Sequence, residues 1–261
     1  GNATLFVVGD TSIDDILPFL ERAFGKWRDS GAAGLPKNLA KVNVAEQGRL
    51  IIIDRPGSQQ SLILAGHVAP PTGVPENIAI LTMNDILGGG FTARVNMNLR
   101  ENKGWSYGAN TSVAGARGQS IWAVYASVQT NRTADSIKEL IGEFDAYLDD
   151  AKATNSELIR SVQNSINSLP GRFETNGAVL SVLLSNQRFG RDDDYVESLA
   201  GKYRDLDLDE IHRAANEVIK TDRLTWIVIG DREKIEAELR ALELGPVSVM
   251  DSDGNVLQYE G

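Results

Sequence analysis

Residues 87–108 read LGGGFTARVNMNLRENKGWSYG, and this stretch constrains the fold more than any other part of the chain. An apolar helix is expected over 76–87, ending in three glycines, and a second helix is expected over 92–102. Gly104 suits the left-handed position that follows a helix, so the chain should reverse there and return as a strand beside the last helical turn. The pattern predicts a helix-to-strand corner that carries Arg100 and Tyr107.

On both sides of this corner, short apolar runs of strand length alternate with longer segments of helical period. Strands are expected at 3–10, 49–54, 60–68, 106–114, 120–130 and 224–231. Further helices are expected at 13–24, 134–151, 155–169, 176–189, near 195, at 208–219 and ending near 242. Because strands are followed by several consecutive helices, we expect an α+β fold with an antiparallel or mixed sheet covered by helices.

Composition narrows the possible functions of the 261-residue chain. Its formal net charge of −10 disfavours nucleic acid as a partner, because phosphate binding needs a basic surface. No apolar run reaches the ~18–20 residues that cross a membrane, so a soluble protein without a membrane span is expected. Zero cysteines exclude disulfides and thiolate metal sites.

The chain also contains one internal repeat. TLFVVGDTSIDDILPFLERAFG begins at Thr4, and LTWIVIGDREKIEAELRALELG begins at Leu224; both read as strand, Gly-Asp, amphipathic helix and glycine. Chance recurrence of a common strand-helix unit is the alternative. The repeat predicts four parts: 1–28 as the closing unit of a preceding homologous domain, 29–48 as a linker, 49–245 as a complete domain, and 246–261 as a C-terminal tail.

The corner offers two side chains suited to holding a peptide. Arg100 has a planar fork of donors and Tyr107 a hydroxyl, and both groups suit a carbonyl oxygen or a developing oxyanion. The alternative is structural: Arg100 pairs with Glu101 or another acidic neighbour, and Tyr107 packs as an ordinary strand aromatic.

Gly88, Gly89 and Gly90 do not form a phosphate-binding loop, because they follow a helix and no Gly-Lys-Ser/Thr comes after them. They favour a corner where two helices pack closely or where a peptide approaches the backbone. His67 and His212 have no acidic residue or second histidine at helical spacing, so structural roles are expected. The chain contains no His-x-x-Glu-His or its inverse, and we expect no catalytic or metal-binding residues in it.

Taken together, several motifs resemble the non-catalytic C-terminal half of insulinase-like (pitrilysin) zinc peptidases, the family that includes mitochondrial processing peptidase. The matching segments are VVGD at 7–10, DRPGSQQS at 54–61, ILGGGFTARVNMNLRENKGWSYG at 86–108 and IVIGD at 227–231. Arg100, Glu101, Gly104 and Tyr107 fit the family's Arg-Glu-x-x-Gly-x-x-Tyr pattern.

The resemblance implies a metallohydrolase-like clamshell half (LuxS- or processing-peptidase-like) that binds substrate without catalysing its cleavage. Zinc would sit in the other half, in the same polypeptide or in a separate subunit, and this chain would hold no cofactor. Arg100 and Tyr107 would hold the peptide backbone, with Gly88, Gly89 and Gly90 near the substrate. A scaffold subunit of the same fold without any peptidase role is the alternative. The resemblance also suggests a bacterial periplasm or cell envelope.

Overall fold

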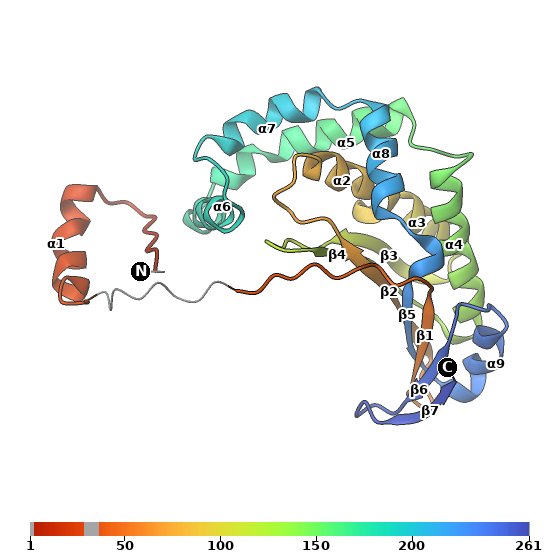
Figure 1. Ribbon diagram of the computed structural model, residues 1–261. Helices are drawn as coiled ribbons and strands as arrows, with labels where there is room; N and C mark the ends of the chain where they lie inside the picture. Colours follow the sequence, from red (N-terminus) through yellow and green to blue (C-terminus); the bar gives the residue numbers. More distant parts are fainter. Residues whose placement is uncertain (1–2, 29–36, 261) are drawn as a thin grey trace.

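The structure is a computed structural model that describes residues 3–28 and 37–260 (Figure 1). In this described part, seven strands form one sheet in the order β3-β4-β2-β5-β1-β6-β7. The strands are β1 (Arg49–Asp54), β2 (Gln60–Ala69), β3 (Ser106–Val113), β4 (Ser120–Gln129), β5 (Thr225–Gly230), β6 (Val247–Met250) and β7 (Val256–Glu260). The part of the expected linker at 29–36 lies outside the described residues.

The sheet is mixed. β1 runs parallel to both β5 and β6, whereas β2 pairs antiparallel with β4 and β5, β3 with β4, and β6 with β7. β5 therefore lies at the centre, between β2 and β1, although it comes late in the sequence. Side chains alternate between buried and more exposed along β2, β4 and β5, as expected when only one face of a sheet is covered.

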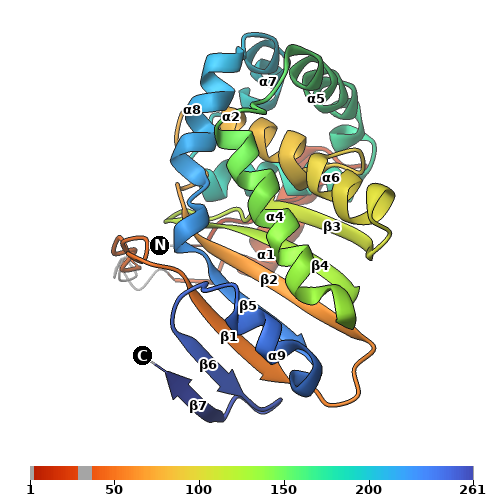
Figure 2. The same cartoon turned by 90° about the vertical axis from the view of Figure 1, so that its right-hand side faces the viewer.

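Helices cover that face. Figure 2 shows α4 (Thr133–Leu148) and α9 (Arg232–Arg240) lying against the sheet, with α8 (Leu208–Val218) beside α4. The other helices of the body are α2 (Asn77–Asn84), α3 (Arg94–Asn96), α5 (Asn155–Ser168), α6 (Asn176–Phe189) and α7 (Tyr195–Arg204). The expected α+β architecture is confirmed, because helices cover a mixed sheet.

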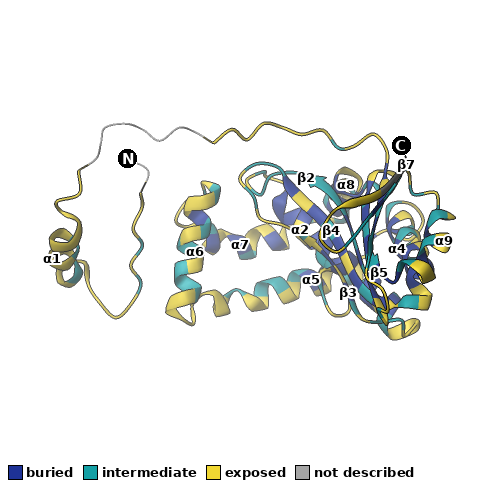
Figure 3. Ribbon diagram, turned by 90° about the horizontal axis from the view of Figure 1, so that it is seen from below, coloured by how far each residue is buried: buried dark blue, intermediate teal, exposed yellow. Residues whose placement is uncertain are grey.

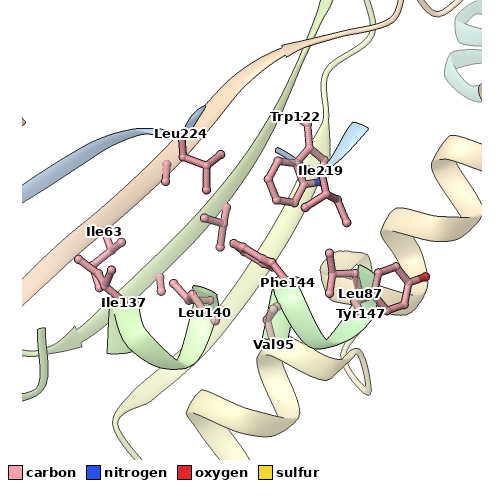
Figure 4. Close-up of a cluster of buried hydrophobic side chains, with 14 of the residues drawn as sticks. Ile63, Leu87, Val95, Trp122, Ile137, Leu140, Phe144, Tyr147, Ile219 and Leu224 are labelled. Atoms are coloured by element: carbon pink, nitrogen blue, oxygen red, sulfur yellow. The ribbon is translucent and has the colours of Figure 1, made fainter. Parts of the chain in front are cut away.

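The main core lies between the sheet and α4 (Figure 4). The ring of Trp122 on β4 meets that of Phe144 on α4 edge to face, with 5.2 Å between the ring centroids. Trp122 also donates its indole N–H to the side chain of Asn84 at the end of α2, over 3.1 Å. A fully buried indole needs such a partner, since an unpaired buried donor destabilises the fold by roughly 1–3 kcal/mol. The core thereby fixes α2 against β4.

The opposite face of the sheet is more open and carries a row of apolar side chains. Tyr125 on β4, Leu64 on β2, Ile227 on β5 and Ile51 on β1 lie side by side in register. Tyr125 is exposed and the other three are half-buried. One face of the sheet thus builds the core, while the other remains accessible.

The first copy of the repeat is only partly confirmed. Helix α1 (Ile13–Phe24) forms where expected, but residues 3–8 form no strand. A strand needs a neighbouring strand for its backbone hydrogen bonds, and β5 has β1 and β2, whereas residues 3–8 have no strand beside them in the described part of the chain. No residue of α1 is buried, and Figure 3 shows the helix apart from the body. Whether 1–28 belongs to a preceding domain stays a prediction.

The region expected to be a tail is part of the sheet. Val247 and Val249 on β6 pair with β1, and β7 continues the sheet beyond β6. Asp251 accepts the backbone N–H groups of Asp253 and Asn255 at 3.0 and 2.8 Å, which forms the turn between the two strands. The segment 247–250 has only four residues, which is too few for its sequence to identify a strand. Only its pairing with β1 reveals one. Among the described residues, no helix combines the length and apolar character needed to cross a membrane.

Candidate functional site

The corner at residues 87–108 is built from two helices that each change pitch. α2 continues into a π-helical turn at Asp85–Gly89, and α3 continues into another at Met97–Asn102. Short π-helical turns inside helices are rare and are often found at functional sites. The expected helix limits of 76–87 and 92–102 are confirmed to within two residues at each end, but periodicity gave no sign of the wider turns.

The glycine run packs against a strand rather than opening a loop. A β-carbon added to Gly88 would lie 2.5 Å from the Thr111 hydroxyl and 2.7 Å from the Thr111 backbone nitrogen on β3. At Gly89 and Gly90 the nearest atoms, in Asn84 and Asp85, would lie at 3.0 and 3.3 Å. Gly88 is therefore explained by close packing of the helix against strand β3, whereas the sequence had suggested close packing of two helices. Gly89 beside it is exposed.

The chain reverses at Gly104, whose φ of +66° is the left-handed conformation expected there. After the reversal, Trp105 donates its backbone N–H to the Leu99 carbonyl at 3.0 Å. Further along β3, Ala109 donates its backbone N–H to the Asn96 side chain at 3.1 Å. The strand thus returns beside the helix that carries Arg100.

Arg100 lies near the end of the helix, with its guanidinium 4.6 Å from the centre of the Phe91 ring. Its Nε also lies 3.3 Å from a carboxylate oxygen of Glu101, and 38% of its side chain is exposed. The expected alternative partner, Glu101, is therefore present. An exposed pair of this kind contributes only about 0–1 kcal/mol, so another acceptor could replace it.

Tyr107 projects from the start of β3 and is 87% exposed. The pairing of β3 with β4 shifts register between Ser106 and Ala109, so Tyr107 lies in an irregular part of the strand. Ser106 stabilises this part, because its hydroxyl oxygen lies 2.7 Å from both the Gly108 and the Ser127 carbonyl oxygens and can donate its one hydrogen to either. Tyr107 does not pack as an ordinary strand aromatic, and in the described part of the chain it forms no hydrogen bond with Arg100.

Arg94 and Glu157 are structural residues that sequence reasoning missed. Arg94 donates two hydrogen bonds to Glu157, at 2.8 and 2.7 Å, and others to the carbonyls of Ala151 and Lys152. Its guanidinium also lies 4.8 Å from the centre of the Tyr147 ring. This network joins the start of α3 to the first turn of α5 and to the segment between α4 and α5.

The electrostatics of the network favour the charged forms of both residues. Burial of Glu157 opposes its ionisation, but hydrogen bonds from Arg94 and Thr154, together with the Arg94 charge, lower the pKa of Glu157 to about 2. Burial also opposes the charge on Arg94, yet the bond and charge of Glu157 raise the pKa of Arg94. Glu157 completes a capping box with Thr154, for which the Thr-x-x-Glu spacing was the available sequence signal.

Each of the two histidines forms a hydrogen bond with a backbone carbonyl. His67 donates from Nδ1 to the Val68 carbonyl at 2.8 Å, and burial lowers the pKa of its imidazole. His212 donates from Nε2 to the Ala153 carbonyl at 3.1 Å. Within the described ranges, no group of three His, Asp or Glu side chains is arranged to hold a metal ion.

A cavity of about 830 Å³ lies elsewhere, between the start of α2 and helices α6, α7 and α8. It shares no residue with the corner that carries Arg100 and Tyr107. Its lining mixes cations such as Arg191, Lys202 and Arg213 with several carboxylates, so it has no clear preference for one charge. At the corner, by contrast, the side chains of Tyr107 and Arg100 are exposed to solvent.

Comparison with known proteins agrees with this geometry. Residues 1–165 match the family described as the peptidase M16 inactive domain, and the chain belongs to this family. An uncharacterized zinc protease of Streptomyces coelicolor is 23% identical over 195 residues, which cover 75% of this chain and 42% of that protein. The chain therefore spans less than half the length of that relative.

Solved structures show the same fold. A protease from Helicobacter pylori matches with a TM-score of 0.75 and 17% sequence identity. The match covers 85% of this chain and 54% of the protease chain. The peptidase M16 inactive domain from Pseudomonas fluorescens matches with a TM-score of 0.66 and 20% sequence identity. The match covers 73% of this chain and 45% of the Pseudomonas chain. The resemblance seen in the motifs is confirmed: this is an M16 inactive domain of the kind found in zinc-protease-like proteins.

Proposed function

We propose that this chain is the substrate-binding half of a bipartite zinc peptidase and that Arg100 and Tyr107 hold the peptide backbone. A second half, in the same polypeptide or in a separate subunit, would supply zinc and the base that activates water. The observation that supports this most is the pair of exposed polar side chains on a corner fixed by buried hydrogen bonds. Arg100 can donate several hydrogen bonds and Tyr107 one, and both match a carbonyl oxygen.

The corner favours binding through side chains over addition of the peptide as an extra strand. β3 is an edge strand, but two of the backbone groups at its centre already have side-chain partners. The Ala109 N–H donates to Asn96, and the Thr111 carbonyl accepts from Asn84 at 3.2 Å. A peptide strand could not form these bonds without displacing two buried amides. Binding therefore falls to Arg100 and Tyr107.

Reconstitution tests the proposal. The chain alone should not cleave fluorescein-labelled casein, whereas the chain combined with a half that carries His-x-x-Glu-His should do so in a zinc-dependent manner. Arg100→Ala should then lower kcat/KM by ~10²–10³-fold, the usual loss for one oxyanion-type donor. Tyr107→Phe removes only the hydroxyl and should lower kcat/KM in the same direction.

Arg188→Ala is the matched control. Arg188 is also exposed, and its guanidinium lies over an aromatic ring, that of Phe189, at 5.3 Å from the ring centre. It lies at the end of α6, away from the corner, so its loss should leave kcat/KM unchanged. A reconstituted enzyme that tolerates both Arg100→Ala and Tyr107→Phe would refute the proposed role.

We also propose that the complete enzyme acts in the bacterial periplasm or cell envelope. A chain without cysteine is compatible with an oxidising compartment, which supports the proposal. Fractionation of cells that express the complete gene product tests it, and recovery in the cytosolic fraction would contradict it.

A further inference from the structure

Asn96 is a buried amide in the helix that carries Arg100, with only 5% of its surface exposed. Its Nδ2 donates to the Phe91 carbonyl at 2.6 Å, and its Oδ1 accepts the Ala109 backbone N–H at 3.1 Å. Both partners are backbone groups that belong to other segments. The side chain therefore joins three parts of the corner: the segment after the glycine run, the helix, and strand β3.

The chemistry of this position calls for an amide. One end must donate to a carbonyl and the other must accept from an N–H, and a primary amide offers both within one short side chain. Asp in place of Asn96 could accept from Ala109 but would place a carboxylate against the Phe91 carbonyl. Leu has a similar size and would leave both backbone groups without their partner.

Each of the two hydrogen bonds of Asn96 holds a segment, called an arm below, that supports one of the two exposed side chains, Arg100 or Tyr107. On one side, Phe91 carries the Arg100 guanidinium over its ring, and 64% of Phe91 is exposed, so few other contacts fix it. On the other side, Ala109 follows directly after the irregular part of β3 that carries Tyr107. Movement of either arm would displace the group it supports.

We propose that Asn96 is a positioning residue that fixes Arg100 and Tyr107 relative to each other, through Phe91 on one side and Ala109 on the other. The inference rests on the proposed function, because it assigns a role to Asn96 only if the two exposed groups bind substrate. Asn96 itself is buried and does not contact the peptide. Its effect is transmitted through the backbone of two segments.

Double-mutant cycles in the reconstituted enzyme test the proposal, with fluorescein-labelled casein as the probe. Asn96→Leu should lower kcat/KM by about tenfold when Arg100 and Tyr107 are intact. In the Arg100→Ala, Tyr107→Phe background it should lower kcat/KM no further, because residues that act through one another are not additive. A merely structural role would give the same fold-loss in both backgrounds.

The two arms can be separated. Asn96→Asp keeps the bond to Ala109 and loses the bond to Phe91, so its effect should disappear in an Arg100→Ala background and persist in a Tyr107→Phe background. This variant also keeps the test decisive if Asn96→Leu does not fold, which circular dichroism would reveal.

Asn186→Leu is the control for losing a buried amide. Asn186 lies on α6, away from the corner; it is 4% exposed and donates to the Asp192 carbonyl at 3.3 Å. It should lower the unfolding midpoint in urea without changing kcat/KM of the folded enzyme.

The outcomes separate the two proposals. If Arg100→Ala and Tyr107→Phe leave kcat/KM unchanged, the proposed function fails and the role of Asn96 falls with it. If those variants lose activity but the Asn96 effects are additive in every background, only the positioning role is overturned.

Discussion

Replacing Arg94 by methionine should destabilise the fold by breaking the network that anchors the Arg100 helix. Methionine retains the apolar stem but loses the bonds to Glu157, Ala151 and Lys152. Breaking a fully buried ion pair costs about 3–5 kcal/mol. The side chains of Arg94 and Glu157 keep 17% and 16% exposure, so we expect the lower end of that range, about 3 kcal/mol. For a domain of this size that corresponds to a fall in Tm of roughly 6–12 °C.

The loss should depend on pH in a defined direction. The pKa of Glu157 is lowered to about 2 in the folded protein, from 4.5, so its stabilising contribution is present above about 4.5 and is lost as pH falls toward 2. The difference in unfolding free energy between the wild type and Arg94→Met should therefore be constant from pH 7 to pH 5 and shrink below that. The hydrogen bonds from Thr154 to Glu157 are present in both proteins, so their contribution to the pH dependence largely cancels when the two unfolding free energies are subtracted.

Urea unfolding followed by circular dichroism, repeated across this pH range, measures the difference directly. Glu157→Gln is the companion variant, since it keeps the shape but removes the charge, and it should show the same pH dependence relative to the wild type. The reasoning would be refuted by a loss below about 1 kcal/mol at pH 7, or by a difference that stays constant down to pH 3.

Two further predictions concern the corner and the N-terminal region. Gly88→Ala should destabilise the protein by about 1–3 kcal/mol, because its new methyl group would overlap Thr111 on β3; urea unfolding at neutral pH measures this, and a neutral result would mean that β3 shifts freely. Deleting residues 1–28 should leave the urea midpoint of the remaining chain unchanged, because α1 buries no residue; a clear drop in the midpoint would show that α1 packs on the body.

Local patterns predicted much of the fold. Strands β1 to β5 and the helices from α4 to α9 lie close to their expected positions, because hydrophobic period and capping residues act over a few residues of sequence. The left-handed Gly104 followed from the same local rules, whereas the packing of Gly88 against β3 did not. The errors came where a strand depends on a distant partner: 3–10 has the composition of a strand but lacks neighbours, whereas 247–250 gains β1 as its neighbour.

The sequence by itself determined most of the elements, the family motifs and the identity of Arg100 and Tyr107, on which the proposed function rests. Only the tertiary structure decided how that corner is held together. Asn96 and Arg94 looked like ordinary helix residues, and their partners Ala109 and Glu157 are 13 and 63 positions away. Periodicity cannot report such contacts, because they arise only after the helices, the strand and the α4–α5 segment have packed.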